Sequence, residues 1–265
     1  MSTDAIAPEI RSHILSRLAA IEAEHDVRIL LAVESGSRAW GFPSPDSDYD
    51  VRFIYQHALP WYVSLSDQRD VIEKGIDEKE IDLSGWDIRK SLRLLLKSNP
   101  VLFEWLASPI QYRANPAFVA EARELFEKVA SRRPLAYHYW SQARSQWRQI
   151  DGRETVKLKK YFYAVRPLLA LDWVLTHRRP PPMQLEALLA GGSVPDEVMT
   201  SIRRLRETKR LTAELGIGPR LGVLDRWLQS RLSGDPPDIA AGQHPQAHAA
   251  ADAFYRRLIG LQAGT

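Results

Sequence analysis

ESGSRAWGFPSPDSDYDVRFIY, residues 34–55, is the stretch that decides the fold, because two expected strands and a polar loop meet in it. The aliphatic run at 29–33 that leads into it has the composition of a buried strand. Gly36-Ser37 follows, and then a loop rich in Gly, Pro, Ser and Asp at 41–47. Asp48-Tyr49-Asp50 then opens a second apolar run at 51–55, which predicts a neighbouring strand.

The carboxylates of Asp48 and Asp50 are two residues apart at the entry to this second strand, so both project from one face. With Cα atoms about 7 Å apart, both can reach one or two Mg²⁺ ions, which prefer oxygen ligands. Two such ions about 4 Å apart can hold the attacking and leaving oxygens of a phosphoryl transfer. The pair therefore predicts a site for two Mg²⁺ ions, which Mn²⁺ can replace.

Gly36-Ser37 supplies the complementary part of this site, a place for phosphate groups. A glycine lets the backbone approach a ligand closely, and backbone N–H groups at the start of a helix attract phosphate. Ser37 adds a hydroxyl group. Gly-Ser alone is a common turn, and a lone Asp-x-Asp is usually a solvated strand edge. Their order between two apolar runs makes Gly36 and Ser37 candidate phosphate-binding residues.

The pattern Gly36-Ser37-x-Ala39-x-Gly41 followed by Ser47-Asp48-x-Asp50 resembles the signature of the DNA polymerase β-like nucleotidyltransferase superfamily. Over residues 25–175 the chain is also similar to a bacterial predicted-nucleotidyltransferase branch related to RNA-ligase-associated DNA polymerase β-like proteins. The resemblance implies an α+β fold, with a small mixed sheet flanked by helices. It also implies metal-dependent transfer of an NMP from an NTP to an acceptor hydroxyl, with release of pyrophosphate.

The superfamily has a third carboxylate on a strand beside the Asp-x-Asp strand. Asp82 is the choice favoured here, because it lies in an expected strand at 79–86 and its apolar neighbours would hold it rigidly. Asp87 is the alternative, but it directly precedes a helical run, where capping the helix explains an aspartate equally well. The predicted catalytic and metal-binding set is Asp48, Asp50 and Asp82.

A change of pattern near residue 112 divides the chain into an expected catalytic domain at 1–112 and an all-helical substrate-binding domain at 113–265. The informative helix of the second domain is expected at 154–177. Lys157, Lys160 and Tyr161, and nearby Arg166, fall on or near one of its faces. We expect the first three to contact the nucleotide, although a solvated amphipathic helix would show the same pattern.

Composition limits the compartment and the class of protein. The 265 residues include no cysteine, which excludes disulfides and thiolate metal sites and fits a reducing cytoplasm. No run of 18 apolar residues predicts a membrane span, and the first residues do not read as a signal peptide. A net charge of +3 allows nucleic acid as a partner without requiring it. We therefore expect a cytoplasmic protein without a membrane partner.

The acceptor of the transfer stays open in the sequence. Mild basicity and the branch resemblance favour RNA, such as a tRNA 3′ end or a broken end awaiting repair. A protein hydroxyl or a small metabolite would suit the same chemistry. A different class of function is a non-catalytic nucleotide- or RNA-binding regulator, or a partner in a toxin–antitoxin type pair. Base preference and oligomeric state are not determined by any motif.

Overall fold

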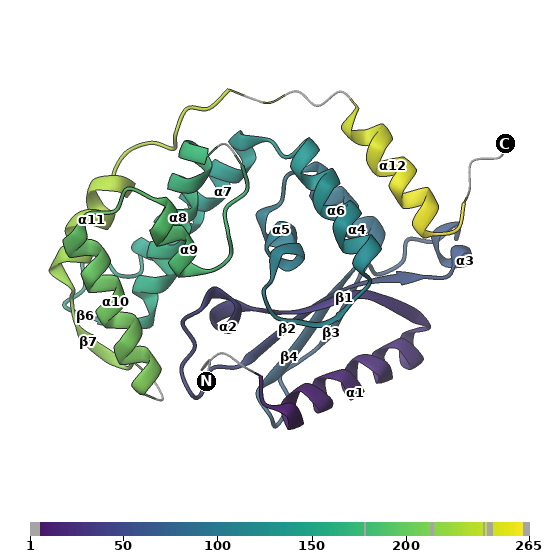
Figure 1. Cartoon of the computed structure of the whole chain (residues 1–265), viewed down its shortest axis with the longest axis horizontal. Helices are drawn as coiled ribbons and strands as arrows, with labels where there is room; N and C mark the ends of the chain where they lie inside the picture. Colours follow the sequence, from purple (N-terminus) through teal and green to yellow (C-terminus); the bar gives the residue numbers. More distant parts are fainter. Residues whose placement is uncertain (1–5, 178, 213–214, 241, 243–245, 262–265) are drawn as a thin grey trace. The chain divides into compact units, whose positions relative to one another are not determined.

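The computed structural model describes residues 6–177, 179–212, 215–240, 242 and 246–261 (Figure 1). Contacts between residues divide the chain into two compact units. The first unit comprises residues 1–39, 48–130 and 243–265, and the second comprises residues 40–47 and 131–242. In the part that the structure describes, no helix is long and apolar enough to cross a membrane.

A mixed five-stranded sheet with the strand order β3-β4-β2-β1-β5 forms the centre of the first unit. Its strands are β1 (Val27–Ser35), β2 (Tyr49–His57), β3 (Val71–Lys74), β4 (Ile81–Asp87) and β5 (Gln111–Ala114). The pairs β1–β2, β1–β5 and β3–β4 are antiparallel, whereas β2 and β4 run parallel. The expected α+β class and small mixed sheet are confirmed.

Helices cover both faces of this sheet. One face is covered by α1 (Pro8–His25) (Figure 1). This helix buries Ile14, Leu18 and Ile21 in a core with side chains of β1, β2 and β4. The other helices of the unit are α2 (Gly36–Trp40, whose last residue belongs to the second unit), α3 (Leu59–Tyr62), α4 (Ile88–Leu96), α5 (Pro100–Ala107), α6 (Pro116–Val129) and α12 (Ala247–Leu258). Side chains of Asp87, Asn99 and Asn115 cap the first turns of α4, α5 and α6, which fixes where these helices begin.

The first unit extends beyond the predicted boundary at residue 112. That boundary falls inside β5, which pairs with β1. Farther along the chain, the rings of Phe118 in α6 and Phe254 in α12 stack with centroids 6.0 Å apart. Gln56 of β2 donates to the backbone oxygen of Leu258. These contacts explain why α6 and α12 belong to the first unit, although local sequence pattern marks them only as helices.

The second unit is mainly helical, with α7 (Arg132–Trp147), α8 (Lys159–His177), α9 (Leu185–Gly191), α10 (Asp196–Leu211) and α11 (Gly222–Leu232). It also contains a two-stranded sheet of β6 (Thr155–Lys157) and β7 (Ile217–Pro219), so the expectation of helices alone is wrong. The loop at 40–47 joins this unit because Phe42 stacks on Phe162, with ring centroids 4.6 Å apart.

Candidate active site

Asp50 and Asp82 are direct neighbours on the two parallel strands at the centre of the sheet. The register of β2 and β4 pairs Asp50 with Asp82. Their side chains are 33% and 31% exposed, so both carboxylates are reachable from solvent although the strands beneath them are buried. Asp48 precedes β2 and is exposed. The structure thus places Asp82 beside the Asp-x-Asp motif, as the strand pattern predicts.

Gly36 lies directly against the carboxylate of Asp50. It begins α2 with a φ of +63°, a left-handed conformation that favours glycine. A Cβ atom added at this position would stand 2.0 Å from Oδ2 of Asp50. Only glycine therefore fits between the end of β1 and the start of β2. Ser37 is the next residue of this turn, so the Gly-Ser turn and Asp50 come together in space.

Arg52 links the two paired carboxylates. Its Nη2 atom donates to Oδ2 of Asp82 at 2.7 Å and to Oδ1 of Asp50 at 3.1 Å. Its Nη1 atom donates to the backbone oxygens of Val51 and Asp82, both at 3.1 Å. The side chain is 19% exposed and held at four points. One guanidinium group therefore keeps Asp50 and Asp82 side by side.

Glu34 supports the same site from beneath. This side chain is 0% exposed, and its Oε1 atom accepts a 2.9 Å hydrogen bond from the backbone N–H of Asp50. Its Oε2 atom accepts from the hydroxyl of buried Tyr112. Burial raises the pKa of Glu34 to about 7, against the opposing effect of the hydrogen bond from Tyr112. Glu34 thus fixes the backbone at Asp50 from a position closed to solvent.

The carboxylate of Asp50 is partly buried and lies near two other negative charges, those of Asp48 and Asp82. Burial raises the pKa of this carboxyl, Arg52 opposes the shift, and the charges of Asp48 and Asp82 add to it. Arg38 contributes positive charge on the same side, since its Nε atom donates to the backbone oxygen of Asp48 at 3.1 Å. Burial is the largest cause of the raised pKa, and a cation bound beside Asp50 would offset the repulsion from Asp48 and Asp82.

Asp87, the alternative third carboxylate, has a structural role. Its side chain is 0% exposed, and Oδ1 accepts a 2.7 Å hydrogen bond from the backbone N–H of Arg89 in the first turn of α4. Its Oδ2 atom accepts from the hydroxyl of Tyr62, also at 2.7 Å. The helix-capping interpretation of Asp87 is therefore confirmed, and Asp82 is the carboxylate that lies next to Asp50.

The three residues predicted to reach the nucleotide from the helical domain all lie in the second unit. Lys157 is exposed at the end of β6, because the expected helix begins only at Lys159. Lys160 is half-buried, with Nζ 5.7 Å from the ring centroid of Tyr163. Roles for these two lysines in nucleotide binding stay predictions.

Tyr161 departs from its expected position on an exposed helix face. It is 0% exposed, donates to Asp225 at 2.7 Å and accepts from the backbone N–H of Leu221 at 2.9 Å. Arg166, expected on the same face, is also buried and donates twice to the backbone oxygen of Met183. The reason is that neighbouring elements pack around most of α8, so this helix has no broad solvent face.

The donor set on the sheet suits a hard divalent cation. Asp48, Asp50 and Asp82 offer only oxygen ligands, and the backbone of Gly36 lies directly against the carboxylate of Asp50. Within the described residues, no three carboxylate or imidazole side chains are gathered closely enough to enclose an ion in this conformation. Arg52 holds both Asp50 and Asp82 in it. The guanidinium uses one oxygen of each carboxylate, so an ion bound at this pair would share the two side chains with Arg52.

Two functional candidates were missed in the sequence pattern. Glu34 is the one charged residue among the buried positions of β1, directly before the Gly-Ser turn, and an ionisable group in an otherwise apolar strand is a usable signal. Arg52 is two residues after Asp50 and therefore on the same strand face. Its contact with Asp82 could not be read from sequence, because it depends on the parallel pairing of β2 with β4.

Comparisons with known proteins identify the family of the chain. Residues 10–257 match the family model RlaP, described as the RNA repair pathway DNA polymerase beta family. The chain is 41% identical over 223 residues to YcgL of Bacillus subtilis (strain 168), which is named an uncharacterized protein, across 84% of this chain and 85% of that one.

Among solved structures, a nucleotidyltransferase-like protein from Exiguobacterium sibiricum 255-15 aligns with 91% of this chain and 73% of its own. It is 12% identical with a TM-score of 0.26, a likeness that supports no inference about this chain.

Proposed function

Because the chain belongs to the RNA repair pathway DNA polymerase beta family, we propose that it is a metal-dependent nucleotidyltransferase that moves an NMP from an NTP to a hydroxyl at an RNA end. The main support for the proposal is that the Gly36-Ser37 turn, the Asp48-x-Asp50 motif and Asp82 lie together at one end of the sheet. Gly36 leaves no room for a Cβ atom beside Asp50, and Asp82 pairs with Asp50 on the next strand. These parts suit the phosphates and ions of such a reaction.

In this proposal Asp48 and Asp50 hold two Mg²⁺ ions, and Asp82 completes the ligand set on the acceptor side. Bound Mg²⁺ would neutralise phosphate charge and lower the pKa of the acceptor hydroxyl. Gly36 and Ser37 bind the β- and γ-phosphates, where the backbone is close to Asp50. The acceptor oxygen bonds to the α-phosphorus as the bond to the β-phosphate oxygen breaks. Pyrophosphate leaves, and a carboxylate on the acceptor side receives the hydroxyl proton.

Arg52 and Glu34 act as positioning residues in this scheme. Arg52 holds Asp50 and Asp82 together before ions arrive, through hydrogen bonds to both carboxylates. Glu34 fixes the backbone of Asp50 from beneath the sheet. When side chains are already held in place before a ligand binds, less binding free energy is spent on ordering them.

The alternative is a nucleotide- or RNA-binding regulator without catalysis. The electrostatics of Asp50 favour the enzyme over this alternative. Burial raises the pKa of the Asp50 carboxyl, the charges of Asp48 and Asp82 add to the shift, and Arg52 opposes it. Neighbouring carboxylates that repel one another are stabilised by a bound cation, which the transfer reaction requires.

The test is transfer of label from each α-phosphate-labelled NTP, with Mg²⁺ or Mn²⁺, onto total RNA or onto cell protein. We expect label on RNA from the natural protein and none from Asp48→Ala plus Asp50→Ala. If only protein becomes labelled, the acceptor of the reaction is a protein hydroxyl and not an RNA end. Tight nucleotide binding without transfer under either metal would instead establish the regulator.

A further inference from the structure

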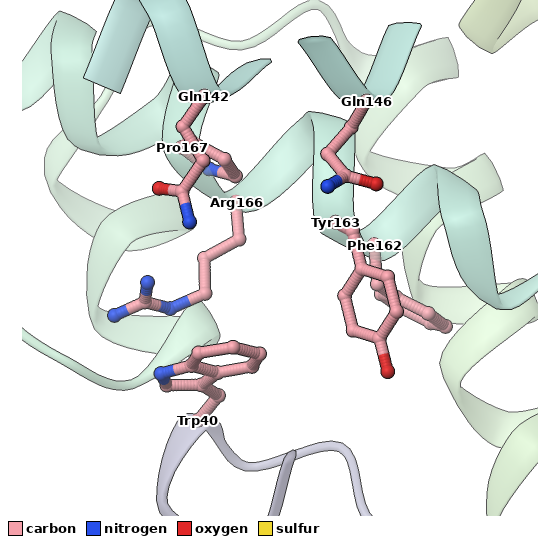
Figure 2. A pocket seen from close by; sticks show the side chains of 7 residues that line it. All are labelled: Trp40, Gln142, Gln146, Phe162, Tyr163, Arg166 and Pro167. Carbon is pink, nitrogen blue, oxygen red and sulfur yellow. The ribbon is translucent and has the colours of Figure 1, made fainter. Parts of the chain in front are cut away.

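A pocket in the second unit is shaped to receive a flat ring. It has a volume of about 210 Å³ and lies between α7, α8 and Trp40. Figure 2 shows the indole of Trp40 on one side, the ring of Tyr163 on another and the guanidinium of Arg166 beside the indole. The Arg166 guanidinium stands 4.6 Å from the Trp40 ring centroid. The rings of Trp40 and Tyr163 meet edge to face, with centroids 6.3 Å apart, so they form two adjoining walls and a planar group can stack on one of them.

Two carboxamide groups reach into this pocket from α7. Gln142 and Gln146 are four residues apart and therefore lie on the same helix face, and Figure 2 shows them side by side along the pocket. Among the described residues, Oε1 of Gln146 and Nε1 of Trp40 are buried polar atoms that lack a hydrogen-bond partner. Carboxamides offer both donors and acceptors, which is what the edge of a nucleobase requires.

The same glutamines also border a second hollow on the outer face of α7. This shallower hollow has a volume of about 460 Å³ and is lined by Tyr137, His138, Ser141 and Ser145 besides the glutamines. Tyr137 is 57% exposed, which is unusual for a large ring. The pocket and the hollow therefore adjoin at Gln142 and Gln146, with an exposed aromatic ring farther along the helix.

The charge of α7 complements a polyanion. Residues 131–148 contain Arg132, Arg133, Arg144 and Arg148 and no Asp or Glu. Arg133 and Arg148 are exposed near the two ends of the helix, and Arg144 lies over the Trp140 ring at 4.7 Å. Basic side chains beside exposed rings and amide groups are typical of surfaces that bind single-stranded nucleic acid.

We propose that this α7 face, defined by Tyr137, Gln142, Gln146 and the pocket between Trp40 and Tyr163, binds single-stranded nucleic acid. One base enters the pocket, where the carboxamides contact its edge, and further nucleotides lie along the hollow with their phosphates near Arg133 and Arg148. The inference rests on the proposed function in one respect, since the bound strand is then the acceptor of the transfer.

Binding of a 5′-fluorescein-labelled single-stranded RNA of about 12 nucleotides, measured by anisotropy with the full chain, tests this inference. We expect Gln142→Ala plus Gln146→Ala to weaken binding about 5- to 20-fold. Arg148→Glu should weaken it and also flatten its dependence on salt, because one phosphate contact is lost. Arg204→Glu, the same charge change at an exposed position of α10, is the matched control and should bind as the natural protein does.

Two further arms identify what occupies the pocket. The RNA duplex of the same sequence should bind more weakly, since its bases are not free to enter. ATP added as the competitor, in place of unlabelled RNA, should not displace the labelled strand. Displacement that disappears in the double glutamine variant would assign the pocket to the NTP base and overturn the inference. Unchanged RNA binding by the glutamine variant, or equal weakening by Arg204→Glu, would also overturn it.

The result is separable from the proposed transfer reaction. Asp48→Ala plus Asp50→Ala should abolish transfer and keep the affinity for RNA. If the natural protein transfers label to a non-RNA acceptor and does not bind the strand, this inference fails while the transferase proposal stands. If the strand binds at the α7 face and no NTP is ever consumed, the transferase proposal fails while this inference stands.

Discussion

Nη2 of Arg52 lies 2.7 Å from Oδ2 of Asp82, a hydrogen-bonded ion pair between neighbouring strands at the candidate active site. The same nitrogen lies 3.1 Å from Asp50. Arg52 therefore neutralises the carboxylates that a divalent ion would bind. It has two opposing effects, because it preserves their spacing in the ion-free protein and competes with the ion for their oxygens.

Replacing Arg52 by Gln should separate these effects. Without the guanidinium competitor, we expect Mn²⁺ to bind several-fold more tightly, as measured by electron paramagnetic resonance of the free ion. The ion-free protein should lose about 1–2 kcal/mol of unfolding free energy, because hydrogen bonds to partly buried charges are removed. Arg69→Gln, which breaks an exposed pair with Glu73, is the control and should change neither quantity. Weaker Mn²⁺ binding in Arg52→Gln would show that holding the carboxylates outweighs competition.

Gly36→Ala should damage both stability and transfer. The added methyl group would meet Asp50 Oδ2 at 2.0 Å, and the φ of +63° adds strain. We expect a loss of at least about 2 kcal/mol in urea unfolding and a displaced Asp50 carboxylate. Gly152→Ala provides the comparison, since its φ is +74° and nothing lies within 4 Å of the new Cβ. It should cost only about 1 kcal/mol. Equal costs for the two variants would contradict the contact with Asp50.

Asp82→Asn and Asp87→Asn should have opposite consequences. Asp82 is partly exposed beside Asp50, so Asn there should abolish metal-dependent transfer with little change in unfolding free energy. Asp87 is buried, caps α4 and accepts from Tyr62, so Asn there should cost about 1–3 kcal/mol of stability. Folded Asp87→Asn should retain transfer. Loss of transfer in folded Asp87→Asn, with activity kept in Asp82→Asn, would exchange their roles.

Glu34 should make the unfolding free energy depend on pH near neutrality. Its folded pKa is raised from 4.5 to about 7, so the folded state binds more protons than the unfolded state between these values. The stability it contributes is present below pH 4.5 and is lost as the pH rises through 7, by about 3 kcal/mol in total. Glu34→Gln cannot ionise. Its unfolding free energy relative to the natural protein should therefore rise across this interval, and a constant difference would contradict the assignment.

The sheet and its site were the most predictable parts of the chain. Local sequence signals were enough to predict β1 and β2. The apolar run of each strand and the polar loop between Gly36 and Asp50 are each continuous in sequence. The strand position of Asp82 beside Asp50 was predictable for the same reason, since it lies between apolar neighbours, whereas its catalytic role stays a prediction. The sequence pattern does not show which strands pair with one another. The ion pair between Arg52 and Asp82 was therefore not expected, because it depends on the pairing of β2 with β4.

The helical half of the chain was less predictable. Tyr161 has the spacing of a surface residue, yet packing from several sides of α8 buries it. The strands β6 and β7 are only three residues each and pair across about sixty residues of sequence, which leaves no periodic signal. The packing of α12 in the first unit depends on contacts such as that between Phe118 and Phe254, which no local propensity encodes.

The central claim is that the carboxylates at Asp48, Asp50 and Asp82 serve cleavage between the α- and β-phosphates of an NTP. The most direct measurement follows two labels in parallel reactions with Mg²⁺ and cellular RNA, one on the α-phosphate and one on the γ-phosphate. The account predicts α label covalently on the acceptor and γ label only in pyrophosphate, both lost in Asp50→Asn. Transfer of the γ label to an acceptor, or release of inorganic phosphate alone, would contradict it.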